Sequence, residues 1–314
     1  MVNYKNGNVY VSIDENTGTK IRFSKEDDFH PSFAESMDVN TTYKCSNQNC
    51  SWCYLSCTPK GKHADLTSDY VVDTFIPSLH PYIELALNGN DLDNPTLLPF
   101  LEMLKAQKVF ANITVNQNQF MYNLQTLADW QENGLIHGIG ISYKKYDGEF
   151  FLSLSKVENV VIHVVAGIFS KEDLYHLAFR DLNLLILGYK NIGRGKGYYE
   201  HMNRLIADNQ DFLKKYLRTK AFYEEFKAIG FDTLACKQLD IKSMLSEDEW
   251  ETMYQGDDGS FTFYVDLVNN HFAKSSTSNF IYDINNRNVN EMFNFITKEA
   301  PLCQERKEVK QTKQ

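Results

Sequence analysis

The sequence has no apolar run long enough to cross a membrane. Its longest run, from Val160 to Phe169, is interrupted by His163 and is far shorter than a spanning helix requires. The first residues, Met1 to Gly7, also lack the apolar segment of a secretory signal peptide. We therefore expect a cytoplasmic protein with no membrane partner. In that compartment, clustered cysteines more often bind metals or carry out redox chemistry than form disulfides.

Positive charge is also scarce. Among 314 residues, 32 Lys and Arg face 41 Asp and Glu, which gives a formal net charge of −9 at pH 7. Proteins that bind nucleic acid generally need a basic face, so the net charge does not support a nucleic-acid partner. Hydrophobic residues make up 43% and charged residues 23%, as in an ordinary folded protein. The chain is long enough to bury a sizeable core.

The sequence has only one cluster of cysteines. Four of the six cysteines occupy one stretch: Cys45, Cys50, Cys53 and Cys57. The other two, Cys236 and Cys303, stand alone, and no histidine has metal-ligand spacing; His63 fits a surface or core position. Such a stretch can hold an iron–sulfur cluster, structural zinc, disulfides or unrelated buried thiols. Zinc is disfavoured because no second C-x2-C or H-x3-H pair follows.

The cysteine spacing resembles a known signature. The loop reads Cys45-x4-Cys50-x2-Cys53, with the aromatic Trp52 just before the last cysteine. Three ligands on a four-iron cube leave one iron open to a small molecule. This loop resembles that of the radical S-adenosylmethionine (radical SAM) superfamily, C-x3-C-x-Φ-C with a bulky Φ. It departs from the pattern at Cys45, where four residues intervene, so whether Cys57 replaces one ligand stays open.

The resemblance implies a cofactor and a reaction. Cys45, Cys50 and Cys53 would hold a [4Fe–4S] cluster whose open iron chelates the amino and carboxyl groups of S-adenosylmethionine. Reduction would then cleave S-adenosylmethionine to a 5′-deoxyadenosyl radical, which abstracts hydrogen from a substrate that the sequence does not identify. An electron donor such as flavodoxin or ferredoxin is implied as a partner. Auxiliary clusters are not supported, because the second half has no cysteine cluster.

Alternating strand and helix patterns predict an α/β fold. Apolar strand patterns centred near residues 39, 85, 112, 140, 163 and 185 are separated by largely helical segments, which favours a parallel sheet or barrel. Six such units match the partial (β/α)6 TIM-like barrel of the radical SAM superfamily. We expect an N-terminal β-hairpin and connector over 1–35, this core over 36–197 and an α+β extension over 198–304 that covers the barrel mouth. A flexible tail would occupy 305–314.

In such barrels, ligands bind at the carboxyl ends of the strands. Besides Trp52, the residues expected there are Asn88, Gly89, Asn90, Asp91, Asn116, Ser142, Lys190 and Arg194. The turn from Asn88 stands where the superfamily carries Gly-Gly-Glu-Pro, so Asn90 or Asp91 is the candidate for the amino group of the cofactor. Lys190 or Arg194, in a glycine-rich stretch, would hold its carboxylate or an anionic substrate. The plainer alternative is a set of solvated turns.

Two other functions remain open. A zinc-stabilised binding module explains the cysteines but not the strand and helix repetition. A degenerate barrel acting as a non-catalytic interaction protein fits the wider Cys45 to Cys50 spacing.

Two local features stand out in the last hundred residues. The polar segment Ala273 to Ser278 is predicted to be a loop on the substrate side. Ser246 and Glu249 have the spacing of a helix capping box.

Overall fold

A computed structural model describes residues 1–15, 19–26, 29–46, 50–254 and 256–299. Its main feature is a ten-stranded sheet with the strand order β10-β9-β8-β7-β6-β5-β4-β11-β12-β13. The six central strands are β4 (Ser36–Asn40), β5 (Glu84–Asn88), β6 (Phe110–Asn116), β7 (Gly138–Ser142), β8 (Val160–Val165) and β9 (Asn183–Leu187). All six run parallel and pair in chain order. The predicted α/β class and the six predicted strands are therefore confirmed.

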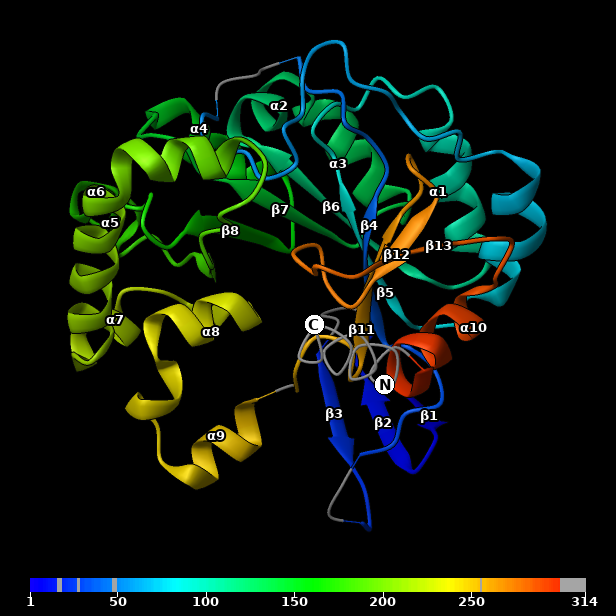
Figure 1. The fold of residues 1–314 in the computed structure, drawn as a ribbon. Helices are drawn as coiled ribbons and strands as arrows, with labels where there is room; N and C mark the ends of the chain where they lie inside the picture. The colour runs from blue at the N-terminus through cyan, green and yellow to red at the C-terminus, as the bar shows by residue number, and fades with distance from the viewer. Residues whose placement is uncertain (16–18, 27–28, 47–49, 255, 300–314) are drawn as a thin grey trace, which may run out of the picture.

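The sheet is open. Its order ends at β10 (Ala228–Phe231) on one side and at β13 (Ile281–Asp283) on the other. Strand β11 (Thr262–Asp266) runs parallel to β4, and β12 (His271–Ala273) continues the sheet antiparallel. Figure 1 shows the strands following an arc rather than a closed cylinder. The extension expected after residue 197 thus supplies strands to both edges of the sheet.

Helices cover the outside of this arc (Figure 1). They are α1 (Leu97–Ala106), α2 (Gln117–Tyr122), α3 (Leu124–Glu132), α4 (Gly148–Ser153), α5 (Lys171–Leu177) and α6 (Arg194–Leu217). In α1 the buried residues Leu97, Phe100, Leu101 and Leu104 follow the i, i+3, i+4, i+7 spacing of one helix face. This face packs into the same core as the outward side chains of the strands, such as Val39 and Leu87.

The inner face of the sheet is different. Parallel sheets are normally covered on both faces. Here Asp38 in β4 and its register partner Ala86 in β5 are both exposed, while their sequence neighbours Val39 and Leu87 are buried. Alternation along β4 and β5 therefore separates an apolar outer face from an inner face that water reaches at Asp38 and Ala86.

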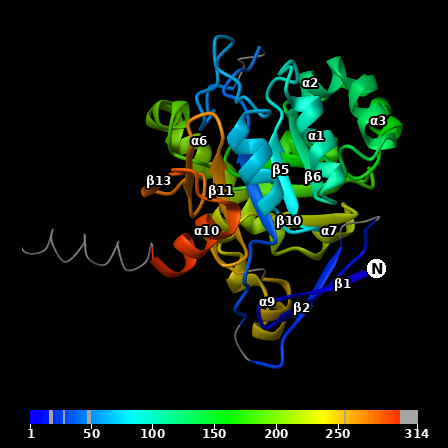
Figure 2. The same ribbon diagram turned by 90° about the vertical axis from the view of Figure 1, so that its right-hand side faces the viewer.

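A second, three-stranded sheet precedes the large one. It consists of β1 (Val2–Asn6), β2 (Val9–Ile13) and β3 (Lys20–Phe23), all antiparallel, and contains the predicted hairpin. The hairpin turn at 16–18 lies outside the described residues. Arg22 joins this sheet to the fully buried Glu35 at 2.6 Å. Figures 1 and 2 place the small sheet at the opposite end of the large sheet from the loop that follows β4.

The remaining helices are short. They are η1 (Val71–Phe75), η2 (Ile76–Ser78), η3 (Leu154–Lys156), α7 (Lys220–Glu224), α8 (Thr233–Leu239), η4 (Ile241–Met244), α9 (Glu247–Met253), α10 (Val289–Asn294) and η5 (Phe295–Glu299). The capping box predicted for Ser246 and Glu249 is present at the start of α9. Over the described residues, no helix combines the length and apolarity needed to span a bilayer. Cys303 and the predicted tail lie outside the described residues.

Candidate functional site

The cysteine loop leaves the carboxyl end of β4, as predicted. Its two arms are joined by backbone hydrogen bonds: Tyr43 donates to Lys62 (2.8 Å), Thr58 to Tyr43 (3.1 Å) and Cys45 to Thr58 (2.9 Å). These bonds fix the base of the loop, so the cysteines are held at the carboxyl edge of the sheet. Residues 47–49 within the loop lie outside the described residues.

The thiols of the loop differ in acidity. None of Cys45, Cys50, Cys53, Cys57 and Cys236 is in a disulfide. A hydrogen bond from the Cys57 thiol lowers the pKa of Cys53 to about 6, against the opposing effect of burial. The same bond, together with burial, raises the pKa of Cys57. Burial also raises the pKa of Cys50, although Lys144 opposes it. Cys53 therefore ionises more readily than Cys50 or Cys57.

The donor set of the loop consists of thiols, which suit an iron–sulfur cluster or zinc. Within the described ranges, no three His, Cys, Asp or Glu side chains are arranged to hold a metal ion. Cys57 is 2% exposed, and its sulfur accepts a 3.0 Å hydrogen bond from the Asn90 amide. Cys57 is thus buried, while Cys45, Cys50 and Cys53 are partly exposed.

Arg194, the first residue of α6, holds the loop in place. Its guanidinium donates to the carbonyl oxygens of Cys57 (2.7 Å) and Cys50 (3.3 Å). Its backbone N–H lies 3.2 Å from the Cys53 carbonyl oxygen and 2.9 Å from the Ser56 hydroxyl. Arg194 therefore contacts four residues of the loop at once.

The glycines before Arg194 allow this approach. Gly193 has a φ of +56°, and a Cβ there would collide with the carbonyl oxygen of Tyr54. A Cβ on Gly195 would lie 2.5 Å from the Lys190 carbonyl oxygen and 3.2 Å from that of Trp52. The glycine-rich stretch therefore packs directly against the cysteine loop.

Asn88 connects the end of β5 to the start of the loop. Its side-chain oxygen accepts from the backbone N–H (2.5 Å) and hydroxyl (3.1 Å) of Thr41. Its amide donates to the Asn40 side chain (2.5 Å) and to the Thr42 carbonyl oxygen (2.7 Å). All of these partners lie in or just after β4, so Asn88 fixes the direction in which the loop leaves the sheet.

The rest of this turn continues the contact. Asn90 donates to the sulfur of Cys57, and the Asp91 carboxylate accepts from the backbone N–H (3.1 Å) and the hydroxyl of Ser46. Gly89 packs so closely on β6 that a Cβ would lie 2.9 Å from the Ile113 side chain. The predicted binding of the cofactor amino group by Asn90 or Asp91 stays a prediction, since both side chains here hold the loop.

The other predicted residues occupy the same edge. Asn116 ends β6 and caps α2, accepting from the backbone N–H groups of Asn118 (3.1 Å) and Gln119 (3.0 Å). Ser142 ends β7 next to it in register. The ring of Trp52 meets that of Tyr198 edge to face at 5.8 Å. The structure thus gathers the predicted residues along the carboxyl edge of the sheet; their roles toward a ligand stay predictions.

Lys190 extends from the end of β9 over the inner face. Its ammonium donates to the Ser276 hydroxyl at 2.8 Å and lies 4.1 Å from the centre of the Tyr54 ring. Burial acts to lower its pKa, but the nearby Tyr54 and Asp38 outweigh burial, and the pKa is raised. Lys190 is therefore a firmly charged ammonium. The Ser276 contact also places part of the predicted substrate-side loop at this position.

Two residues that the sequence did not single out belong to this edge. Asp266, fully buried at the end of β11, accepts a hydrogen bond from Tyr43. His163 in β8 lies over Gly140, and burial lowers its pKa to about 4. Asp266 ends an alternating apolar strand, which is a signal for a strand-end position. His163 interrupts an apolar run, which is a signal for an inward-facing polar side chain.

No protein-family model matches this chain, and no curated protein sequence matches it. Its structure is similar to crystal structures of SuiB from Streptococcus suis. One of these, bound to S-adenosylmethionine, has a TM-score of 0.54 and 12% identity over 85% of this chain and 68% of SuiB. A second SuiB structure gives a TM-score of 0.52 and 12% identity over 86% of this chain and 67% of SuiB. At this identity, the comparison shows a shared fold.

Proposed function

We propose that this protein is a radical SAM enzyme, in which Cys45, Cys50 and Cys53 hold a [4Fe–4S] cluster and S-adenosylmethionine binds beside it. One observation carries the proposal. The cysteine loop sits at the carboxyl end of the first strand of the parallel series, where the loops after β5 and β9 both hold it in place. Similarity in fold to SuiB, which binds S-adenosylmethionine, supports the same assignment.

The residues of the loop suit a cluster. Cys45, Cys50 and Cys53 are partly exposed whereas Cys57 is buried, and iron–sulfur clusters are held by cysteine thiolates. Cys57 is then a supporting residue. Its thiol donates a hydrogen bond to Cys53, and its sulfur accepts one from the Asn90 amide. Hydrogen bonds to ligand sulfurs tune a cluster's potential.

When bound, the cluster would supply the electron that cleaves S-adenosylmethionine to methionine and a 5′-deoxyadenosyl radical. The protein's own task is to orient the reactants and exclude side reactions. Arg194, Asn88, Asn90 and Asp91 keep the loop in one conformation, as their hydrogen bonds indicate. A small electron-transfer protein such as flavodoxin or ferredoxin would deliver the electron, and the substrate would occupy the inner face.

The test is anaerobic iron–sulfur reconstitution of the full chain. Iron and sulfide per chain, the electron paramagnetic resonance of the reduced protein, and 5′-deoxyadenosine formed with dithionite and S-adenosylmethionine would be measured. The wild type should bind about four irons and release the nucleoside. Cys53→Ala should do neither, whereas Cys236→Ala, a cysteine outside the loop, should behave as wild type.

Cys57→Ala separates ligand from support. If Cys45, Cys50 and Cys53 are the ligands, this variant keeps its iron, but its electron paramagnetic resonance spectrum is altered. Loss of iron in Cys57→Ala together with retention of iron in Cys45→Ala would show that Cys57, and not Cys45, is the third ligand. Tightly bound zinc that iron does not replace would favour the binding module, and a cluster without nucleoside release would favour the degenerate barrel.

A further inference from the structure

Asp38 lies in the middle of β4 with its carboxylate on the inner face of the sheet. The residue is exposed, as is Ala86 beside it in β5. Water in contact with the centre of two adjacent parallel strands is unusual, because such strands are normally covered on both faces. The small Ala86 side chain leaves the Asp38 carboxylate accessible from the inner face.

The carboxylate of Asp38 has no hydrogen-bond or ion-pair partner among the residues that the structure describes. Desolvation by the surrounding protein raises its pKa, and Lys190 only partly opposes this. A donor or a cation that reaches the carboxylate would favour its charged form. The inner face therefore contains an acid that lacks a direct partner.

One positive and two negative side chains act on the Asp38 carboxylate. Lys190 is the cation whose field acts on Asp38, while Asp232 and Asp258 add negative charge. The Lys190 ammonium is already engaged by Ser276 and Tyr54. Asp232 is likewise engaged, accepting from the backbone N–H groups of Gly188 (2.8 Å) and Ala235 (2.6 Å). Unlike Lys190 and Asp232, Asp38 has no direct partner, so an incoming ligand could supply one.

We propose that Asp38 is an anchoring residue for a cationic nitrogen, a protonated amine or a guanidinium, on the substrate. Charge-assisted hydrogen bonds to a carboxylate are the strong ones, and both cations supply several donors. Lys190, Tyr54 and Ser276 form the neighbouring wall, drawn from the loops after β9, β4 and β12. This subsite rests on the proposed function in that it faces the cofactor edge, but its test needs neither cluster nor S-adenosylmethionine.

The test uses the full chain without iron and three probes of equal length: n-butylammonium, n-butanol and butyrate. Binding is followed by saturation-transfer difference NMR titration. We expect n-butylammonium to bind at least about tenfold more tightly than n-butanol, as a charge-assisted bond implies. Asp38→Asn should abolish this preference, whereas Asp248→Asn, which removes an exposed carboxylate from α9, should keep it.

Lys190→Met gives an independent arm, because removing the competing ammonium should raise the affinity for n-butylammonium several-fold. Asp38→Asn should also melt no lower than the wild type, since the carboxylate it replaces has no partner. An unchanged ammonium preference in a folded Asp38→Asn variant would overturn the proposal. So would a preference for butyrate in the wild type, or weaker n-butylammonium binding in Lys190→Met. Failure of cluster assembly would affect none of these readouts.

Discussion

The phenol of Tyr43 donates a 2.6 Å hydrogen bond to the carboxylate of Asp266, 223 positions away in the sequence. Tyr43 begins the cysteine loop and Asp266 ends β11, the strand that pairs with β4. Asp266 is fully buried and also accepts from the backbone N–H groups of Val268 (2.9 Å) and Asn269 (3.0 Å). Strand β11 is therefore joined to the cysteine loop by the hydrogen bond between the buried Asp266 carboxylate and Tyr43.

Tyr43→Phe should lower the free energy of unfolding by about 2 kcal/mol, because a buried carboxylate loses its side-chain donor from the loop. Urea unfolding measures this, with Tyr122→Phe as the matched control. Tyr122 is 87% exposed, so its hydroxyl removal should have little effect. Equal unfolding midpoints for the two variants would show that the Tyr43 bond does not stabilise the protein.

The strand series was predictable because it is written in local patterns. The apolar residues of strands, such as Val39 and Leu87, and the helical spacing between the strands can be recognised from short stretches of sequence. The edges of the sheet were not predictable in this way. Strand β11 pairs with β4 across more than two hundred residues, and nothing in the local pattern of Thr262–Asp266 specifies that partner.

The site was predictable in location more than in roles. Strand ends place Asn88, Asn116 and Lys190 on one edge, because parallel strands end together. Hydrogen-bond partners depend instead on how the loops cross. The guanidinium of Arg194 therefore holds cysteine-loop carbonyls, a contact that no spacing rule contains.

Gly193→Ala should disturb the packing of the glycine-rich stretch on the cysteine loop. The residue has a positive φ, and a methyl group would collide with the Tyr54 carbonyl oxygen. We expect a loss of about 1–3 kcal/mol in the free energy of unfolding and lower iron uptake on reconstitution. Gly197→Ala is the control four residues on, where a Cβ meets nothing within 4 Å. A helical alanine there should be neutral or stabilising, so similar losses in both variants would contradict the steric argument.

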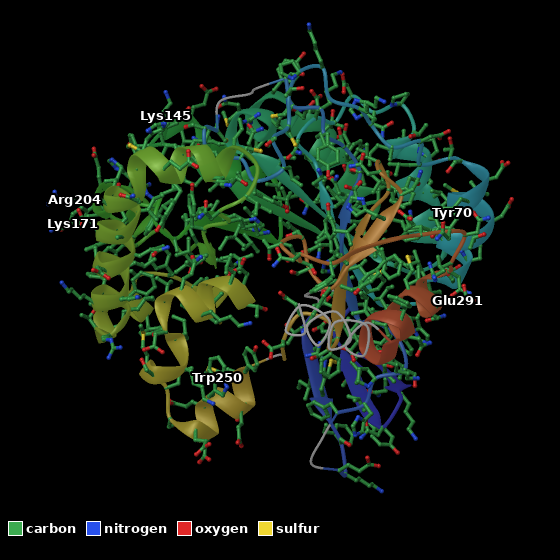
Figure 3. All side chains as sticks on the ribbon, in the orientation of Figure 1. Tyr70, Lys145, Lys171, Arg204, Trp250 and Glu291 are labelled. Carbon is green, nitrogen blue, oxygen red and sulfur yellow. The ribbon has the colours of Figure 1, made fainter. Side chains whose placement is uncertain are left out.

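Arg194→Gln should loosen the loop, since glutamine cannot span the two carbonyl oxygens that the guanidinium binds. We expect roughly 2 kcal/mol less stability and slower iron incorporation, followed by absorbance during reconstitution. Arg204→Gln is matched in helix and in chemistry. Arg204 is exposed on α6, and Figure 3 places it on the outer side of the molecule. Parallel behaviour of the two variants would remove Arg194 from any role in holding the loop.

His163 should make stability depend on pH. Its folded pKa of about 4 lies below the usual 6.5 because of burial, so the folded protein keeps the ring neutral. As the pH falls below 6.5, the unfolded chain takes up a proton that the folded protein refuses, and stability is lost progressively toward pH 4. Between pH 7.5 and 5 this contributes about 2 kcal/mol. Urea unfolding at both pH values should show a smaller loss for His163→Gln than for the wild type by about that amount. An identical loss in both would mean that the ring is protonated in the folded state, and that the inner face around Gly140 is wetter than its burial indicates.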